Sequence, residues 1–418
     1  MPDIYFYSYI AIIFIVFFIT FLFRGLSENS LLLATGASII PFIMIPYFPM
    51  GVARVFSVPW VYIPYYIVVL SMFVQYGVKF YKSDGALFKL ILAYIFLSFI
   101  ITFVSDSSVT AAAYWIVWVI NFLTLFIVQS YFINYSSLNK IESVIKLLVY
   151  GLVLFCLVGI FRYFSGINAD ANFFPFMNRN GTVYLINILT PMLFYMYSSN
   201  IISLKKFLLL FVIVLLSLFL IESRSGIIVF VLISAIFFQK NVKYIIFLFI
   251  FGFFIFSLLE IGGSLMERFS SISNSILFLF NQEYLTEETR DYRRIVLLLS
   301  SFEMIKENFW FGVGLSMESY FKAYLNISGL HPFLGAKAHN FFISYFIQLG
   351  FLVFSILIVI FYKIYNKFPI GERYKKSFRL SFIAIIFLMF TNEYIHFPLI
   401  WMFMGLALSI NKLEFRKK

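Results

Sequence analysis

Residues 204–239 read LKKFLLLFVIVLLSLFLIESRSGIIVFVLISAIFFQ and decide the class of fold. Two apolar runs flank one short polar turn, Glu222-Ser-Arg-Ser-Gly226. Only 12% of the whole chain is charged and 62% is hydrophobic, whereas a soluble domain carries about twice that charge. Lipid must therefore be the solvent for much of the surface. Segments that cross lipid in such runs do so as helices, because helices satisfy their own backbone hydrogen bonds.

Runs of this kind recur along the chain, and we expect an all-α polytopic membrane protein with about 12–13 transmembrane helices and one long extracytoplasmic loop. The number is a range because several runs are shorter than the roughly 20 residues that an upright helix needs. The apolar runs are 4–23, 31–49, 58–78, 87–104, 110–133, 143–163, 181–199, 204–221, 225–239, 242–260, 339–362, 377–392 and 396–411. They divide the chain into an N-terminal transmembrane bundle (1–260), the long loop (261–338) and C-terminal transmembrane helices (339–418).

The net charge of +12 sets the predicted orientation. The cations fall in short loops between apolar runs, where Lys and Arg mark the cytoplasmic side, so the charge gives no support for a nucleic-acid partner. The densest cluster lies between residues 363 and 379, and we expect it to be cytoplasmic together with Lys205. Alternation of the spans then places the 164–180 loop, the Arg224 turn and the 261–338 loop on the external side.

The long loop contains one predicted amphipathic helix, over residues 287–308. Its apolar row consists of Ile295, Leu298, Leu299, Phe302 and Ile305. Arg290 and Arg294 are four residues apart and therefore share one face of this helix. Because Arg294 also continues the row of Leu298, we expect it to point toward the membrane body rather than toward water.

His339 is the candidate proton acceptor. It opens the apolar run that follows the long loop, where water and lipid headgroups meet, and imidazole accepts protons near neutral pH. Asn340 beside it is predicted to hold either an acceptor molecule or the chain itself. The alternative for His339 is an interfacial histidine that only caps a helix.

Arg224 and the loop arginines are the candidate anion-binding groups. An arginine at the centre of a span costs roughly 2.5–3.5 kcal/mol, so Arg224 must lie at the surface or be paired. A guanidinium group binds phosphate oxygens through two hydrogen bonds at once, so Arg224 and Arg294, with Arg290, are predicted to hold a diphosphate from two sides. The alternatives are an interfacial Arg224 paired with Glu222 and a solvated arginine patch on the loop helix.

Several patterns are missing from the sequence. No Asp-x-Asp pair, no carboxylate–histidine cluster with metal-ligand spacing and no phosphate-binding glycine loop of the Walker type is present. The sequence has a single cysteine, Cys156, in an apolar run. We therefore expect neither a metal nor a cofactor, and ATP-driven transport is disfavoured.

Four ordered motifs carry a family resemblance. They are Met177-Asn-Arg-Asn-Gly181 before an apolar run, Ser223-Arg-Ser-Gly226, Arg294 with Phe311-Gly-Val-Gly314 in the long loop, and His339-Asn340 followed by Gly350. In this order and spacing the chain resembles the superfamily of O-antigen polymerases and O-antigen ligases, which are glycosyltransferases of the bacterial inner membrane. Val353 stands three residues past Gly350, where ligases usually have Gly, Thr or Tyr, and it favours the polymerase branch.

The resemblance implies a lipid-linked donor, an undecaprenyl-diphosphate oligosaccharide displayed on the external leaflet of the bacterial cytoplasmic membrane. It implies that repeat units of a polysaccharide such as O-antigen or capsule are joined by inverting, metal-independent transfer. The partners implied are this substrate, the bilayer and a chain-length regulator protein.

The resemblance also implies roles for the candidate residues. His339 would deprotonate the acceptor hydroxyl, and Arg224 and Arg294, with Arg290, would stabilise the departing diphosphate. Contacts with sugar hydroxyls are expected from Asn340, Asn178, Arg179, Asn180 and Tyr184.

Two alternatives remain. The first is an O-antigen ligase, which transfers finished glycan to an acceptor by the same chemistry. The second is a flippase for lipid-linked oligosaccharides, which would also have many spans. A transporter is expected to carry charged residues at mid-span and pseudo-symmetric halves, whereas charge in this sequence clusters in loops.

Overall fold

The computed structural model describes residues 54–55, 58–59, 85–135, 137–164, 179–239, 290–327, 340–368, 372–391 and 393–416. The predicted spans at 4–23, 31–49 and 242–260, and nearly all of 58–78, lie outside the described residues. The described part is helical apart from one antiparallel pair of two-residue strands, β1 (Arg54–Val55) and β2 (Val58–Pro59). The predicted all-α class is confirmed.

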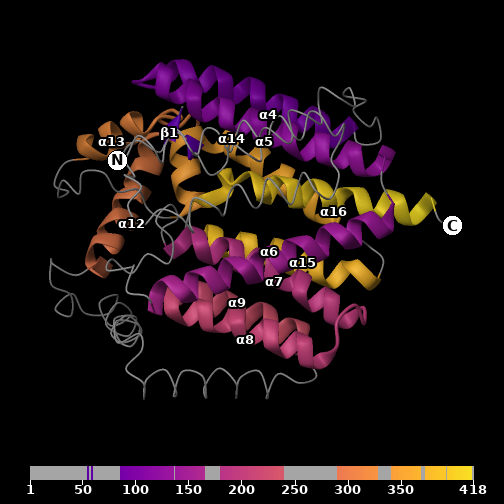
Figure 1. Cartoon of the computed structure of the whole chain (residues 1–418). Helices are drawn as coiled ribbons and strands as arrows, with labels where there is room; N and C mark the ends of the chain where they lie inside the picture. Colours follow the sequence, from indigo (N-terminus) through magenta and orange to yellow (C-terminus); the bar gives the residue numbers. More distant parts are fainter. Residues whose placement is uncertain are drawn as a thin grey trace, which may run out of the picture.

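Most of the helices follow the predicted apolar runs closely, and α12 follows the predicted loop helix, but the long loop contains a second helix, α13, where only one was predicted. They are α4 (Gly85–Val104), α5 (Ser108–Tyr135), α6 (Leu138–Phe164), α7 (Arg179–Ser198), α8 (Leu204–Ile221), α9 (Arg224–Phe237), α12 (Arg290–Glu307), α13 (Met317–Asn326), α14 (Phe341–Asn366), α15 (Glu372–Met389), the short 3-10 helix η6 (Tyr394–His396) and α16 (Pro398–Arg416). Most of them lie side by side in one bundle, while α12 and α13 lie at one end of it (Figure 1).

Within the described residues, five helices are long and apolar enough to cross a membrane. They are Gly85–Val104, Ser108–Asn134, Leu138–Phe164, Leu204–Ile221 and Phe341–Asn366. Two shorter apolar helices, Arg224–Phe237 and Pro398–Ile410, accompany them. A multi-pass membrane protein is therefore confirmed, whereas the total of about 12–13 spans depends on residues that the structure does not describe.

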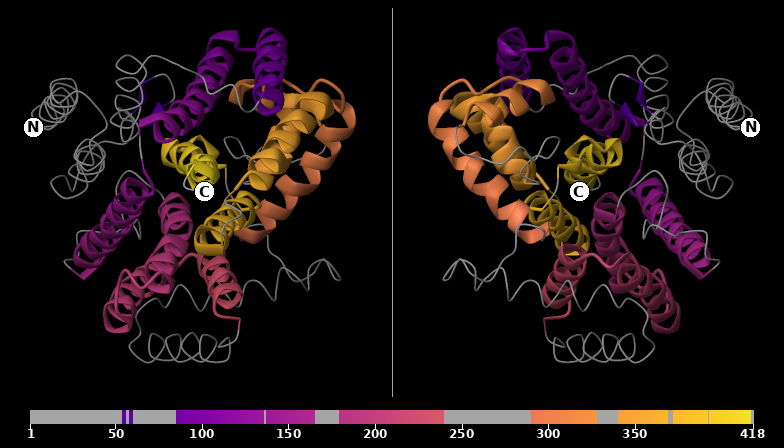
Figure 2. Two further views of the ribbon diagram at one scale, coloured as in Figure 1. Left: turned by 90° about the vertical axis from the view of Figure 1, so that its right-hand side faces the viewer. Right: turned by 90° about the vertical axis from the view of Figure 1, so that its left-hand side faces the viewer.

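The core of the bundle is built around α16. Figure 2 shows α16 in yellow, surrounded by the other helices. It packs along α5, and the approach is so close that a Cβ at Gly405 would lie 2.6 Å from the carbonyl oxygen of Leu125. The ring centroids of Phe122 and Trp401 are 4.9 Å apart in the same interface. A second close pair is α7 with α15, where the Ser381 hydroxyl donates to the Ile188 carbonyl over 2.7 Å.

The polar turn at 222–226 is a tight reversal between two helices. The Ser203 side chain accepts from the Lys206 amide at the start of α8, and α8 ends at Glu222, which adopts a left-handed conformation with φ of 55°. The Glu222 amide donates back to the Phe219 carbonyl over 3.0 Å. Helix α9 begins two residues later, at Arg224.

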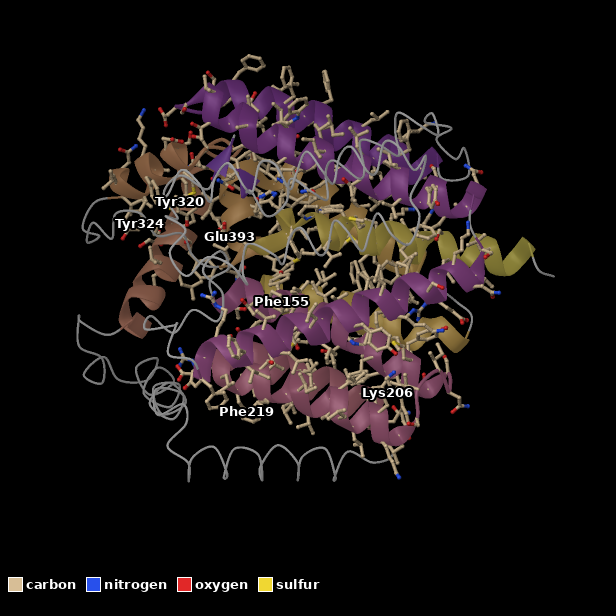
Figure 3. The ribbon with its side chains drawn as sticks, in the orientation of Figure 1. Phe155, Lys206, Phe219, Tyr320, Tyr324 and Glu393 are labelled. Atoms are coloured by element: carbon tan, nitrogen blue, oxygen red, sulfur yellow. The ribbon has the colours of Figure 1, made fainter. Side chains whose placement is uncertain are left out.

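The bundle has two distinct ends. At one end the Lys206 ammonium donates to the Tyr150 hydroxyl over 2.9 Å, and Lys376 donates to the Phe237 carbonyl over 2.6 Å. Phe219 and Glu393 lie toward the opposite end, which also carries α13 (Figure 3). We call this second end, with residues 105–107, 222–224, 340 and 393, the site end.

Candidate functional site

Of the predicted site residues, the structure describes side chains for three: Arg224, Asn340 and Tyr184. His339 and Asn178 lie outside the described residues. The helical positions of Arg179, Asn180, Arg290 and Arg294 are described, at the starts of α7 and α12, but their side chains are not.

Asn340 caps helix α14. Its backbone is extended, and its side-chain oxygen accepts a hydrogen bond from the Ile343 amide over 3.2 Å. Such a bond satisfies one of the amides that have no partner in the first turn of a helix. Of the two roles predicted for Asn340, this contact supports holding the chain. It fixes the point at which the chain leaves His339 and enters the membrane helix.

Arg224 is half-buried and begins helix α9, which rests directly on α7. A Cβ at Gly226 would lie 2.2 Å from Val183 Cγ1, so no larger residue fits at this point without movement. The buried Asn187 side chain joins the two helices, since its Nδ2 donates to the carbonyls of Val183 and Gly226 over 3.0 Å and 3.2 Å. Because Val183 lies one turn from Arg179, two of the predicted segments meet at the site end.

Tyr184 belongs to the core of this contact. Its side chain is buried, and its hydroxyl donates to the Ile385 carbonyl of α15 over 3.3 Å. This position links α7 to α15. It offers no support for the predicted contact of Tyr184 with a sugar.

The loop helix α12 packs with a different row of residues from the predicted one. Leu297, Ser301 and Met304 are buried, whereas the predicted Leu299 and Phe302 are 58% and 49% exposed. The reason is that α12 carries apolar residues on two faces, and Leu297 and Met304 form the one that meets Tyr320, Tyr324 and Ile347. The Leu298 row was the ground for expecting Arg294 to face the membrane body, and Leu298 is also exposed.

The Phe311-Gly-Val-Gly314 motif docks on a break in α14. Gly350 interrupts this helix with φ of 69° and ψ of 172°. At the break, the amides of Val313 and Gly314 donate to the carbonyls of Ile347 and Gln348 over 2.9 Å and 3.1 Å. Two of the motifs quoted from the sequence are therefore direct backbone partners.

A third bond and two further glycines complete this docking. The Phe351 amide donates to the Phe309 carbonyl over 2.7 Å. Gly312 and Gly314 both have positive φ, at 69° and 106°, a region that favours glycine. The sequence offered no sign that the glycine motif of the loop and Gly350 would meet.

The turn between α4 and α5 supports the docked segment from the other side. The Leu315 amide donates to Ser105 Oγ over 3.0 Å, and the Asp106 amide donates to Ser319 Oγ over 2.8 Å. The ammonium group of Lys322 pairs with Asp106 Oδ1 at 2.5 Å. The start of α13 is thereby attached to the membrane helices.

A cluster of polar side chains that we did not select from the sequence lies on the first two turns of α14. The Ser344 hydroxyl donates to Glu393 Oε1, and the Tyr345 hydroxyl hydrogen-bonds to Nε2 of His396. Ser344 and Tyr345 are buried, while Glu393 and His396 are half-buried. The only signal in the sequence was a carboxylate and a histidine three residues apart, where one apolar run ends and the next begins.

Two aromatic rings from α5 lie beside His396. The centroid of the Trp118 ring lies 5.2 Å from that of His396, and the Tyr114 ring lies 6.4 Å away. The Asn121 side chain donates to the His396 carbonyl over 3.4 Å. We call this set of side chains the Glu393–His396 cluster. It consists of Tyr114, Trp118 and Asn121 from α5, Ser344 and Tyr345 from α14, and Glu393 and His396.

The described part of the site end thus combines an arginine turn, the capped start of α14 after His339, a docked loop segment and a carboxylate–imidazole cluster. The described part of the chain is that of a multi-pass membrane protein with polar and charged side chains gathered at one end of its helices. Residues 209–358 match the family model described as O-antigen ligase. A comparison with curated proteins finds no match for the chain.

The match confirms the resemblance to the O-antigen ligase and polymerase superfamily over this stretch. It runs from α8 to α14 and includes Arg224, Arg290, Arg294, His339 and Asn340. Members of this family are glycosyltransferase-like enzymes. The match supports a role in polysaccharide biosynthesis and a multi-pass protein of a bacterial membrane, and the substrates of this family are lipid-linked glycans.

Proposed function

We propose that the protein is a polysaccharide polymerase, which joins undecaprenyl-diphosphate-linked oligosaccharide repeat units at the outer face of the cytoplasmic membrane. The observation that carries the proposal is the docking of the loop motif on Gly350. This docking attaches the segment after α12 to the helix that begins directly after His339-Asn340.

The reaction uses one histidine and three arginines. His339 takes the proton of the acceptor hydroxyl as its oxygen attacks the anomeric carbon of the donor sugar from the face opposite the leaving group. The bond between that carbon and the diphosphate oxygen breaks, and its electron pair stays on the diphosphate. Arg224 and Arg294, with Arg290, stabilise the charge that develops there. A new glycosidic bond forms with inverted configuration.

The neighbours of Arg224 suit this role. Glu222 is buried, and it precedes the half-buried Arg224 by two residues in a turn that α7 holds in place. Because the backbone of the turn is held in place, the Arg224 guanidinium would reach a phosphate from a fixed point. Asn178, Arg179 and Asn180 lie at or next to the start of α7 in the sequence. We propose that they contact sugar hydroxyls of the substrate.

Polymerase is preferred over ligase because Val353 departs from the ligase motif. Ligase is the second candidate because the matching family model carries that description. The family match favours glycosyl transfer over the flippase alternative. If the protein is a polymerase, we expect a chain-length regulator protein as its partner.

The test is the glycolipid profile of a deletion strain that carries plasmid-borne variants. His339→Ala and Arg224→Lys should leave the protein inserted in the membrane yet yield single repeat units on the carrier lipid. Lysine keeps the charge of Arg224 but loses the paired hydrogen bonds. Arg379→Lys is the matched control, since this guanidinium lies over the Tyr365 ring, 5.4 Å from its centroid, at the opposite end of the bundle.

The outcomes separate the candidates. Single repeat units in the deletion strain and in both site variants support a polymerase. Finished polymer that stays on the carrier lipid indicates a ligase, and donor held on the cytoplasmic side indicates a flippase. Normal polymer from His339→Ala would show that the mechanism is wrong.

A further inference from the structure

We propose that Glu393, His396 and Tyr345 form a subsite that binds the sugar of the acceptor, the hydroxyl-bearing partner in the transfer. This inference rests on the proposed glycosyl transfer and adds to it the place where the second substrate is held. Tyr345 belongs to α14, and Glu393 and His396 belong to the segment between α15 and α16. Tyr345 and His396 are 51 positions apart in the sequence.

The first argument is position. Ser344 and Tyr345 follow the cap Asn340 by four and five residues, which places them about 6–8 Å along the axis of α14. The cluster therefore begins one helical turn from the residue that directly follows the proposed base. An acceptor hydroxyl has to come within hydrogen-bond reach of that base, so its sugar must be bound close to this turn.

The second argument is the way in which the two polar pairs are built. In each pair the partner on α14, Ser344 or Tyr345, is buried and orients a half-buried partner, Glu393 or His396. Ionisable side chains in an apolar bundle are costly, and when they carry named partners they are candidates for a functional site. A carboxylate and an imidazole can each exchange further hydrogen bonds with sugar hydroxyls.

The third argument is charge. The donor is recognised through a diphosphate, which needs arginines. A carboxylate repels a diphosphate, so a subsite containing Glu393 favours the neutral, hydroxyl-rich sugar end of the acceptor over the diphosphate end of either substrate. The half-buried Tyr114 ring beside His396 adds an aromatic surface of the kind that lines small-molecule sites.

The experiment uses the full chain purified into lipid nanodiscs. The donor is the lipid-diphosphate oligosaccharide extracted from the deletion strain. The acceptor probe is the same oligosaccharide released from its lipid and tagged at the reducing end, which has no diphosphate and therefore cannot act as donor. Two rates are measured for each variant, transfer to the tagged acceptor and hydrolysis of the donor by water.

Glu393→Gln should raise the KM for the tagged acceptor by about tenfold or more, since a hydrogen bond to a charged group is worth roughly 1.5–3 kcal/mol. Donor hydrolysis should stay within about twofold of the wild type, because the arginines and the carrier lipid are untouched. The ratio of transfer to hydrolysis therefore falls. A merely structural role of Glu393 would lower both rates together, and that result, or an unchanged KM, would overturn the proposal.

A matched pair of variants distinguishes a loss of acceptor binding from a general effect on folding. Tyr345→Phe and Tyr94→Phe each remove one buried hydroxyl next to Trp118, whose ring centroid lies 5.6 Å from Tyr345 and 5.5 Å from Tyr94. Within the described part of the chain the Tyr94 hydroxyl has no hydrogen-bond partner. Tyr345→Phe should raise the acceptor KM and Tyr94→Phe should not, and equal effects of the two would count against the subsite. A wild-type protein that neither transfers nor hydrolyses would instead refute the proposed function.

Discussion

Gly312 and Gly350 lie backbone against backbone. A Cβ at Gly350 would come within 2.5 Å of the Gly312 amide nitrogen, and one at Gly312 would lie 2.6 Å from the Gly350 amide nitrogen. Both residues have φ of 69°. The loop and the membrane helix therefore approach each other at a point that accepts no side chain from either partner.

Gly350→Ala should lower the stability of the protein and its transfer activity. The left-handed backbone alone costs on the order of 1–3 kcal/mol for a residue other than glycine, and the clash adds to this. The measurements are the Tm of the purified protein and the polymer made in the deletion strain. Gly85→Ala is the control, because nothing lies within 4 Å of its added Cβ. Equal Tm values for the two variants would contradict the docked arrangement.

Gly226→Ala should displace the Arg224 turn from α7 and reduce polymer formation. The new methyl group would overlap Val183, whose Cγ1 lies 2.2 Å from the place that this methyl takes on the wild-type backbone. Val183→Ala in the same chain removes the overlapping methyl groups, so the double variant should recover part of the lost activity. Residues in direct contact show such coupling, whereas distant ones add independently. If the double variant loses as much polymer formation as the two single variants together, the contact between Gly226 and Val183 is refuted.

Asn340→Ala should destabilise the protein by about 1 kcal/mol, because the first turn of α14 loses its cap. Asn340→Ser keeps a capping oxygen and should restore stability. If polymer formation also returns with serine, Asn340 acts through the cap; if it does not, Asn340 contacts substrate as well. Ser223→Ala is the comparison, because Ser223 precedes α9 but makes no side-chain cap bond. This variant should lower the Tm less than Asn340→Ala does.

Cysteine labelling tests the predicted orientation. The protein has one cysteine, Cys156, which is buried and should not react with a membrane-impermeant maleimide. Glu318→Cys, an exposed position at the site end, should react in intact spheroplasts. Lys205→Cys, exposed at the opposite end, should react only after the membrane is permeabilised. The reverse pattern would place the site end in the cytoplasm and exclude the proposed function.

The helices were predictable because each membrane span is a local feature. The run 204–221 matches α8 residue for residue, and the predicted 87–104 and 110–133 differ from α4 and α5 by a few residues. Apolar composition sets the bounds of these helices, and at α8 the Ser203 cap also marks the start. The Arg224 turn was predictable for the same reason, since a polar pentapeptide between two apolar runs has to reverse the chain.

The contacts between distant segments were not predictable. Gly350 is a single glycine in a long apolar run, and nothing near it in the sequence indicates that its partner is the segment 309–314. Glu393 and Ser344 are 49 positions apart and belong to no periodic pattern. The packed row of α12 was missed because apolar residues lie on two of its faces, so periodicity alone does not say which face meets the protein.

The docking at Gly350 also limits how far the segment that carries Val313 and Gly314 can move. If the segment carrying Val313 and Gly314 swung away, the Ile347 and Gln348 carbonyls would lose these amide partners within the apolar layer, where each unsatisfied group costs several kcal/mol. We therefore expect that segment to stay attached to α14 while substrates bind and leave.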